Sequence, residues 1–198
     1  MIQKIKLVII GAGGHAKACL DLASRISNIE VVGMIDNKIN HGMKVNGVEV
    51  LGTDLIIPEL IDKKYQFTIG IGQIKTSLAR IKMYEYLISM NARIFNLIAN
   101  SAILSKSVEL GSGITIMEGA KIGPNVILGN GVIINTNAVI EHGSIISDFC
   151  HVSTSAVVNG DCKVGSNTFI GSGTVIKQSI SISSNNVIEM GSRVFHDV

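Results

Sequence analysis

An aliphatic residue recurs at every sixth position along the second half of the chain. The register begins at Leu104 and runs unbroken to Val194. Its members between these ends are Leu110, Ile116, Ile122, Leu128, Ile134, Ile140, Ile146, Val152, Val158, Val164, Ile170, Ile176, Ile182 and Ile188. A β-sandwich would instead show a period of two with irregular spacing. One inward aliphatic residue per hexad is typical of a parallel β-helix, in which each hexad forms one short, flat side.

Other positions of the hexad are also restricted in type. Small or β-branched residues such as Ala120 and Cys150 lie two positions before the aliphatic residue. Gly, Asn or Ser often follows it, as at Gly123; these are turn-compatible types, and the Gly and Asn among them can hold positive φ. Three hexads complete one triangular coil, so the register predicts about five coils in a prism roughly 24 Å long.

Residues 1–97 follow a different pattern, in which short aliphatic runs alternate with amphipathic segments. The expected strands and helices are, in chain order, 7–10, 16–24, 30–35, 67–71 and 76–90. Strands that alternate with helices form a parallel α/β sheet. We therefore predict an α/β, Rossmann-like half domain over residues 1–97 and a parallel β-helix over residues 98–198.

A glycine-rich turn joins the first expected strand to the first expected helix. Residues 11–16 read Gly-Ala-Gly-Gly-His-Ala and fit the pattern G-x-G-x-x-G/A, and Asp36 ends the next strand. Such glycines let the backbone approach a diphosphate at the helix N-terminus, while the acid can hold a ribose hydroxyl. The segment has room for one of the two halves of a dinucleotide site, which favours a nucleotide-linked ligand over NAD. A tight turn that binds nothing is the alternative.

Composition excludes several classes of partner. With a net charge of +2 and no Trp, the chain is a poor candidate for binding nucleic acid. Mean hydropathy is +0.43, but no apolar run reaches the roughly 18 residues of a membrane span. The cysteines Cys19, Cys150 and Cys162 form no CxxC pair, and we interpret residues 4–10 as a strand rather than a signal peptide. These features predict a reduced, cytoplasmic protein, and the lack of zinc-ligand spacing predicts no metal site.

Glu141 and His142 interrupt the small residues of the predicted corners just after Ile140. Residues eighteen apart stack in successive coils, so Pro124 and Gly160 should flank His142 and leave open space around its ring. A histidine titrates near neutral pH and can take a proton from an attacking amine or hydroxyl, particularly when a carboxylate fixes its tautomer. A solvated corner histidine is the alternative.

Four segments from both halves of the chain resemble one bacterial family. They are residues 11–16, 36–37, 135–142 and 148–153. Together they are similar to the hexapeptide-repeat sugar acetyltransferases, which include sialic-acid O-acetyltransferase-like and bacillosamine-pathway N-acetyltransferase enzymes. The resemblance implies a left-handed β-helix, a homotrimer and acetyl-CoA bound between neighbouring prisms. It also implies an acceptor held by the N-terminal domain, commonly a UDP-linked 4-amino-sugar.

The same resemblance implies roles for individual residues. His142 is the expected general base. Many relatives carry an acid directly after the base, where this chain has Gly143, so Glu141 or Asp148 is the expected orienting carboxylate. The expected acetyl-CoA contacts are His151, Ser172, Gly173, Met190 and Gly191. The expected nucleotide-sugar contacts are Gly13, Gly14, His15, Asp36, Asn37, Gly72 and Asn135. From its residue type alone, His151 could equally be a structural polar side chain.

These features predict acetyl transfer from acetyl-CoA to the amine of a nucleotide-linked 4-amino-sugar in bacterial surface-glycan or glycoprotein biosynthesis. O-acetylation of a sialic-acid-type sugar by the same base is the nearest alternative. A catalytically inactive partner of a sugar-biosynthesis enzyme is the alternative from a different class, and Gly143 favours it. The sequence does not identify the sugar or the nucleotide.

Overall fold

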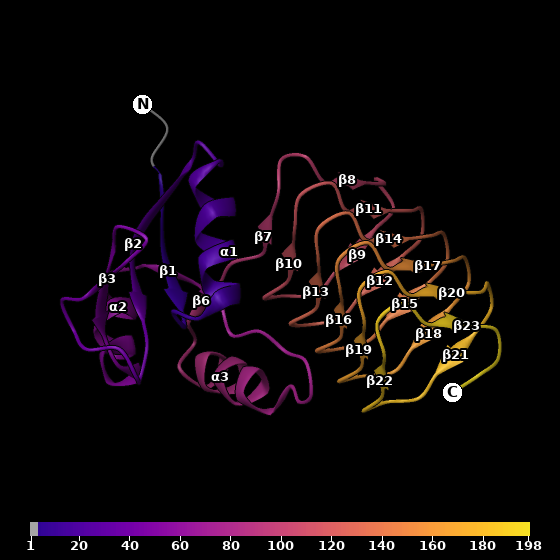
Figure 1. The fold of residues 1–198 in the computed structure, drawn as a ribbon. Helices are drawn as coiled ribbons and strands as arrows, with labels where there is room; N and C mark the ends of the chain where they lie inside the picture. The colour runs from indigo at the N-terminus through magenta and orange to yellow at the C-terminus, as the bar shows by residue number, and fades with distance from the viewer. Residues whose placement is uncertain (1–3) are drawn as a thin grey trace. The chain divides into compact units, whose positions relative to one another are not determined.

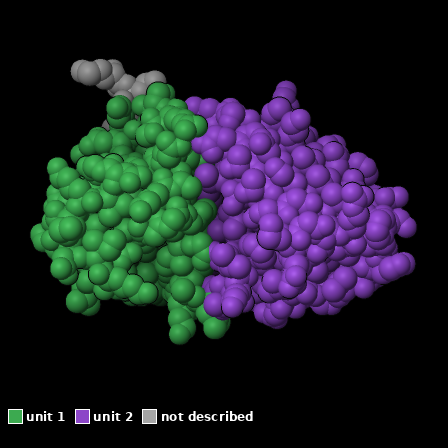
Figure 2. Space-filling model, viewed as in Figure 1, with its two compact units in different colours: residues 1–72, 78–97 green, residues 73–77, 98–198 purple. Residues whose placement is uncertain are grey.

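A computed structural model describes residues 4–198 of the chain. It divides into two compact units: unit 1 comprises residues 1–72 and 78–97, and unit 2 comprises residues 73–77 and 98–198 (Figure 2). The short segment 73–77 therefore belongs with the second unit, although it lies inside the first one in sequence. Residues 1–3 of the expected N-terminal domain lie outside the described residues.

Unit 1 is built on a six-stranded sheet with the strand order β3-β4-β2-β1-β5-β6 (Figure 1). Its elements are β1 (Ile5–Ile10), α1 (Gly14–Ser24), β2 (Ile29–Ile35), β3 (Lys44–Val45), β4 (Val48–Gly52), the 3-10 helix η1 (Asp54–Ile56), α2 (Ile57–Asp62), β5 (Gln66–Ile69), α3 (Leu78–Ser89) and β6 (Arg93–Ile94). The central strand β1 pairs in parallel with β2 and β5. Its residues from Leu7 to Ile10 are at most 2% exposed, as the continuous apolar run predicts for a central parallel strand.

One edge of this sheet differs from the wholly parallel arrangement that we expected. Strands β3 and β4 form an antiparallel hairpin, in which Lys44 pairs with Glu49 and Val45 with Val48. The turn between them is Asn46-Gly47, with φ of 47° and 82°. An Asn-Gly pair with positive φ at both residues is the signature of a two-residue hairpin turn. The sheet is therefore mixed, and the dipeptide was a signal for it.

Arg80 on α3 fixes the end of strand β5. Its guanidinium is fully buried and donates hydrogen bonds to the carbonyl oxygens of Ile69 (2.6 Å) and Ile71 (3.0 Å). Burial lowers the pKa of Arg80 to about 10, so the side chain stays charged at neutral pH. This contact holds the turn that leads to Gly72, one of the expected ligand contacts.

Unit 2 is a prism of short parallel strands stacked in successive coils (Figure 1). The strands are β7 (Leu97–Ile98), β8 (Ile103–Leu104), β9 (Glu109–Leu110), β10 (Thr115–Ile116), β11 (Lys121–Ile122), β12 (Ile127–Leu128), β13 (Ile133–Ile134), β14 (Val139–Ile140), β15 (Ile145–Ile146), β16 (His151–Val152), β17 (Val157–Val158), β18 (Lys163–Val164), β19 (Phe169–Ile170), β20 (Val175–Ile176), β21 (Ser181–Ile182), β22 (Val187–Ile188) and β23 (Arg193–Val194). They form three sheets, with the orders β22-β19-β16-β13-β10-β7, β23-β20-β17-β14-β11-β8 and β21-β18-β15-β12-β9. Each strand pairs with the third strand after it, which joins residues eighteen positions apart, such as Ile122 and Ile140.

The aliphatic register forms the core of the prism. Its members from Ile116 to Ile176 are at most 2% exposed. Cys150 and Cys162 fill the small inward positions of two neighbouring coils and are also fully buried. Burial raises the pKa of the Cys150 thiol to about 12, so this thiol stays protonated at neutral pH. None of the helices in the described part of the chain has the length and apolar character needed to span a bilayer.

The positive φ values lie at one fixed position of each corner. The residue types directly after each inward aliphatic residue, such as Gly123, would have allowed positive φ there. The structure has them two residues later, at Asn125, Gly143 and Asp161 among others, with φ of 56°, 67° and 59°. Gly123 serves close packing instead, because a Cβ there would lie 2.8 Å from the backbone nitrogen of His142 in the next coil.

Candidate active site

His142 lies at the prism corner between β14 and β15. The coils on both sides fix its backbone. The Gly143 N–H donates to the carbonyl of Pro124 (3.0 Å), and the Asp161 N–H donates to the carbonyl of His142 (2.8 Å). The predicted stacking of residues eighteen apart is therefore present at this corner. The imidazole itself is 61% exposed and accessible to a reactant.

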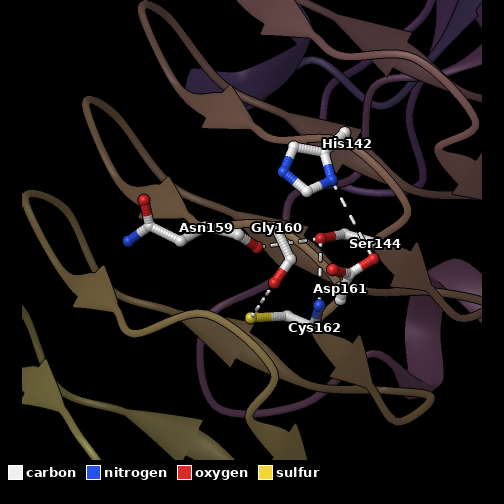
Figure 3. A network of polar contacts seen from close by, with 6 residues as sticks. All are labelled: His142, Ser144, Asn159, Gly160, Asp161 and Cys162. Carbon is white, nitrogen blue, oxygen red and sulfur yellow. Dashed lines mark hydrogen bonds and ion pairs between the residues drawn. The ribbon is translucent and has the colours of Figure 1, made fainter.

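The histidine ring lies over a residue that has no side chain. A Cβ at Gly160 would come 2.5 Å from Cε1 and 2.6 Å from Nε2 of His142. Figure 3 shows the ring standing beside Gly160, with Nδ1 turned toward Asp161. A glycine at position 160 is thus what allows the ring to occupy this place.

The carboxylate beside the ring belongs to Asp161. Its Oδ1 lies 3.9 Å from Nδ1 of His142, and both side chains are largely exposed (Figure 3). The sequence analysis missed Asp161, although it follows Gly143 by eighteen residues and could have been found by the stacking rule. Glu141 is exposed, and its backbone N–H donates to the carbonyl of Val158 (2.9 Å). An orienting role for Glu141 stays a prediction.

Asp148, the second candidate for the orienting carboxylate, lies at a different corner. It follows β15, and its Oδ1 accepts a hydrogen bond from the backbone N–H of Asn130 (2.6 Å). The corner that carries His142 precedes β15, so the two residues lie at opposite ends of one side of the prism. Within a single chain, Asp148 therefore stabilises its own corner and does not reach the His142 ring.

A small polar network fixes the corner that carries Gly160 and Asp161. Ser144 Oγ donates to the carbonyl of Asn159 (2.9 Å) and accepts a hydrogen bond from the Cys162 N–H (3.1 Å) (Figure 3). Ser144 and Cys162 are fully buried. The network holds the residues on both sides of Gly160-Asp161 in place, so the surroundings of the His142 ring are preorganised.

His151 is buried on β16 and has partners in its own unit. Its Nδ1 lies 2.7 Å from the carbonyl oxygen of Gln73, and its Nε2 lies 3.2 Å from Nδ2 of Asn135. A carbonyl only accepts hydrogen bonds, so Nδ1 carries the proton and Nε2 accepts from the Asn135 amide. The Phe169 ring packs edge-on at 5.1 Å. This geometry favours the structural alternative for His151, while the expected ligand contacts of His151 and Asn135 stay predictions.

The other expected acetyl-CoA contacts share one corner of the prism. Ser172 and Gly173 follow β19, and Met190 and Gly191 follow β22 in the next coil. The Gly191 N–H donates to the carbonyl of Ser172 (2.9 Å). A Cβ at either glycine would meet nothing within 4 Å, and Met190 is 77% exposed. The structure thus brings these four residues together on an open surface, at a corner other than that of His142.

The glycine-rich turn of unit 1 forms an open cradle at the start of α1. Gly11 has φ of 97°, which favours glycine, and Gly13 is the N-cap of the helix without any side-chain cap. A Cβ at Gly13 or Gly14 would meet nothing within 4 Å. A Cβ at Gly70 would come 2.8 Å from Cα of Ala16, so the small residue that ends the motif allows close helix–strand packing.

Asp36 shapes this turn through its carboxylate. Oδ2 accepts a hydrogen bond from the Ala12 N–H (2.9 Å), and Oδ1 accepts from the Lys38 N–H (2.8 Å) and the Ile39 N–H (3.2 Å). The side chain therefore ties the glycine-rich turn to the segment after β2. A carboxylate offers about four lone-pair sites, so these bonds leave capacity for a ligand hydroxyl.

The remaining expected contacts of unit 1 lie close to this turn. His15 is on the first turn of α1, and a Cβ at Gly72 would lie 3.2 Å from its Cβ. Asn37 forms a reciprocal pair with Asp54, in which Asn37 Nδ2 donates to Oδ2 of Asp54 (2.6 Å) and the Asp54 N–H donates to Asn37 Oδ1 (3.1 Å). The structure therefore gathers His15 and Gly72 at the carboxyl ends of β1 and β5, where open α/β sheets bind ligands.

A hollow of about 850 Å³ in unit 1 lies at the other end of the sheet. Its lining includes Lys4, Lys6, Lys63, Lys64 and Arg93, near the amino ends of β1, β5 and β6. Ligands of such sheets bind at the carboxyl ends, so this hollow is separate from the expected site. Residues 4–198 contain no group of three or more His, Cys, Asp and Glu side chains that could hold a metal ion.

Known proteins are similar to this chain over nearly its whole length. The PglD N-terminal domain family matches residues 6–87. PerB from Caulobacter crescentus, solved in complex with CoA and GDP-perosamine, is 30% identical with a TM-score of 0.90, and the match covers 98% of this chain and 90% of that one. The chain belongs to the hexapeptide-repeat sugar acetyltransferases. The acetyltransferase domain of PglB from Neisseria gonorrhoeae, in complex with acetyl coenzyme A, is 28% identical with a TM-score of 0.93, and the match covers 98% of this chain and 93% of that one.

Membership of this family confirms three expectations from the sequence. The family resemblance is correct, the prism is a left-handed parallel β-helix, and the protein is an acetyltransferase. The chain covers nearly the full length of its relatives and carries both the glycine-rich turn and the prism.

Proposed function

We propose that this sugar acetyltransferase transfers the acetyl group of acetyl-CoA to the amine of a nucleotide-linked amino sugar. The single observation that carries the proposal is the His142 ring, which is 61% exposed and has a carboxylate on its Nδ1 side. Such a ring presents Nε2 as a base to an attacking amine. The CoA and GDP-perosamine bound to PerB and the acetyl coenzyme A bound to the PglB domain support both substrate classes.

In the proposed reaction, the amine nitrogen of the sugar attacks the thioester carbonyl carbon. Nε2 of His142 takes the proton that this nitrogen loses, and a backbone N–H at a prism corner stabilises the developing oxyanion. The carbon–sulfur bond then breaks, and the proton passes from His142 to the departing CoA sulfur. The products are an N-acetylated sugar nucleotide and CoA, with no net change in protons.

The nucleotide-sugar acceptor is proposed to bind at the glycine-rich turn of unit 1. Gly13 and Gly14 leave space for a diphosphate at the start of α1, and Asp36 offers oxygen lone pairs to a ribose hydroxyl. A UDP-linked 4-amino-sugar is the acceptor that we predict from sequence. The GDP-linked sugar of PerB makes GDP the direct competitor in any test.

We further propose that the enzyme is a homotrimer with acetyl-CoA between neighbouring prisms. His142 lies at the corner that follows the sheet of β14, β17 and β20. Ser172 and Met190 lie at the corner that precedes this sheet. A donor held at one corner is therefore separated from the base of the same chain by a full side of the prism. Packing of prisms side by side would supply the base from a neighbouring subunit.

A thiol-release assay with acetyl-CoA tests the proposal. The acceptor panel comprises UDP- and GDP-linked 4-amino-sugars, the free amino sugars and a sialic acid. We expect release with a nucleotide-linked amine and a product that resists hydroxylamine, because an amide survives this treatment and an ester does not. Release only with the sialic acid would indicate O-acetylation. Absence of release with every acceptor would leave the inactive-partner alternative.

A further inference from the structure

We propose that Asp161 orients His142 from the neighbouring coil and holds the proton on its Nδ1. The inference rests on the proposed function, because it concerns the base of that reaction. Asp161 is a positioning residue here: it acts on the imidazole and does not touch the substrate.

The backbone places Asp161 directly against His142. The Asp161 N–H donates to the carbonyl of His142 (2.8 Å), and Asp161 itself holds φ of 59°. Both flanks of Asp161 are anchored, since Ser144 Oγ bonds to the carbonyl of Asn159 and to the N–H of Cys162. The carboxylate therefore starts from a fixed point next to the ring.

The absence of a side chain at Gly143 gives the carboxylate its place. A Cβ at Gly143 would clash with Oδ1 of Asp161. The space beside Gly143 is thus filled by an acid from the next coil, and a side chain at position 143 would displace the Asp161 carboxylate from this place. Positions 143 and 161 are eighteen residues apart and stack in successive coils, so the Asp161 carboxylate occupies the space that a side chain at Gly143 would fill.

Asp161 is the acid that faces Nδ1. At this corner, the coil before that of His142 carries Gly-Pro-Asn at positions 123–125, which offer no charge. The coil after that of His142 carries Asn-Gly-Asp at positions 159–161. On the corner itself, Glu141 is exposed. The 3.9 Å between Nδ1 and Oδ1 lies within ion-pair range. It exceeds a hydrogen bond of about 3 Å, and such catalytic contacts often tighten when substrate binds.

A carboxylate at Nδ1 has two consequences for a histidine base. It fixes the tautomer in which Nδ1 carries the proton, so the Nε2 lone pair is available to the acceptor amine. It also stabilises the imidazolium that forms when Nε2 takes a proton. Both effects raise the rate of proton transfer without contributing to substrate binding.

The first test uses the free protein and does not depend on activity. In Asp161→Asn the ring loses the carboxylate that holds the proton on Nδ1, so the nitrogen NMR shifts of the neutral His142 ring should move toward those of the other tautomer. Glu109→Gln is the matched control, because Glu109 is an exposed acid on β9, in a different sheet from β14. It should leave the ring-nitrogen shifts unchanged. Identical ring-nitrogen shifts in the wild type and Asp161→Asn would overturn the proposal.

The second test uses the transfer reaction. Asp161→Asn should lower kcat by about tenfold or more, as part of the roughly 10²–10⁴-fold that a positioned general base contributes. The KM values for both substrates should stay the same. Asp161→Glu should recover part of the rate. Melting temperatures near that of the wild type would exclude a general loss of folding.

An exchange of the two positions makes the test sharper. Gly143→Asp combined with Asp161→Gly moves the carboxylate to the residue after the base, and it should restore more activity than Asp161→Gly alone. An unchanged kcat in Asp161→Asn would overturn the role of Asp161. A wild type that transfers acetyl to no acceptor would instead overturn the proposed function, and the ring-nitrogen NMR shifts would still decide whether Asp161 acts on the ring.

Discussion

The imidazole of His142 occupies its place because residue 160 has no side chain. The space that a Cβ would fill is taken by Cε1 and Nε2 of the ring. The φ of Gly160 is not in the left-handed region, so its backbone would accept alanine without strain. Glycine at position 160 therefore leaves space for the His142 side chain, and the backbone conformation does not require it.

Gly160→Ala should consequently reduce activity without unfolding the protein. The added methyl group displaces the exposed ring, which can move at little cost, so we expect kcat to fall at least tenfold while the melting temperature stays nearly constant. The double variant with His142→Ala is the control. If Gly160 acts only through the ring, the double variant should be no slower than His142→Ala alone. A large drop in melting temperature would contradict this explanation.

His142→Ala should itself lower kcat by roughly 10²–10⁴, the usual contribution of a general base. The KM values should change little, because the lost interaction belongs to the transition state. The rise of the wild-type rate with pH through the histidine range should disappear in the variant. Near-complete activity of His142→Ala would mean that the amine loses its proton to bulk water, and His142 would not be the base.

Among the elements of unit 1, the carboxyl ends of β1 and β2 are joined by the hydrogen bonds of one side chain. β1 leads into the glycine-rich turn, and β2 leads into Asp36, whose carboxylate bonds to the Ala12 N–H and to the two N–H groups at Lys38 and Ile39. One side chain thus sets the shape of two adjoining turns. Any ligand contact made by Asp36 is therefore coupled to the shape of the cradle.

Asp36→Ala should raise the KM for the nucleotide sugar by about tenfold or more, since hydrogen bonds to a charged group contribute about 1.5–3 kcal/mol. The KM for acetyl-CoA should not change, because the donor is proposed to bind on the prism. Steady-state kinetics with each substrate varied in turn measures both values. If the unaltered enzyme used the free amino sugar as well as the nucleotide-linked one, the assignment of this cradle would be wrong.

At the scale of the whole molecule, the outward positions of the prism are chemically unequal. On the sheet that contains β14, β17 and β20, the outward residues Val139, Val157 and Val175 form an apolar row, and Val175 is 39% exposed. On the sheet of β9, β12, β15, β18 and β21, the corresponding row mixes the apolar Ile127 and Ile145 with Glu109, Lys163 and Ser181. Three valines in successive coils suit a surface that packs against another copy of the prism.

Light scattering should therefore report a particle three times the mass of the 21.0-kDa chain. Val157→Lys places a charge in the middle of the apolar row and should shift the protein toward monomers, with a loss of activity if the site spans two subunits. Lys163→Glu on the other sheet is the control and should remain trimeric. A stable wild-type monomer at micromolar concentration would reject the trimer.

Much of the prism could be predicted from the sequence because its geometry repeats. One inward residue in six fixes which side chains are buried, and three hexads per coil fix which residues stack. Pro124, His142 and Gly160 were therefore placed correctly as neighbours. In unit 1 the apolar runs predicted β1, β2 and β5 within two residues of their bounds. The hairpin of β3 and β4 was missed although Asn46-Gly47 signalled it.

The coil, its core and the column of residues in which His142 lies follow from local periodicity, so the order of residue types is enough to predict them. Which side chains within a column meet depends on the folded chain. Position 161 faces the ring because position 143 has no side chain, and His151 is buried because the distant segment at Gln73 supplies a carbonyl for its Nδ1. Such contacts depend on side-chain direction and on chain segments far apart in sequence, and a repeating pattern of residue types does not record either of them.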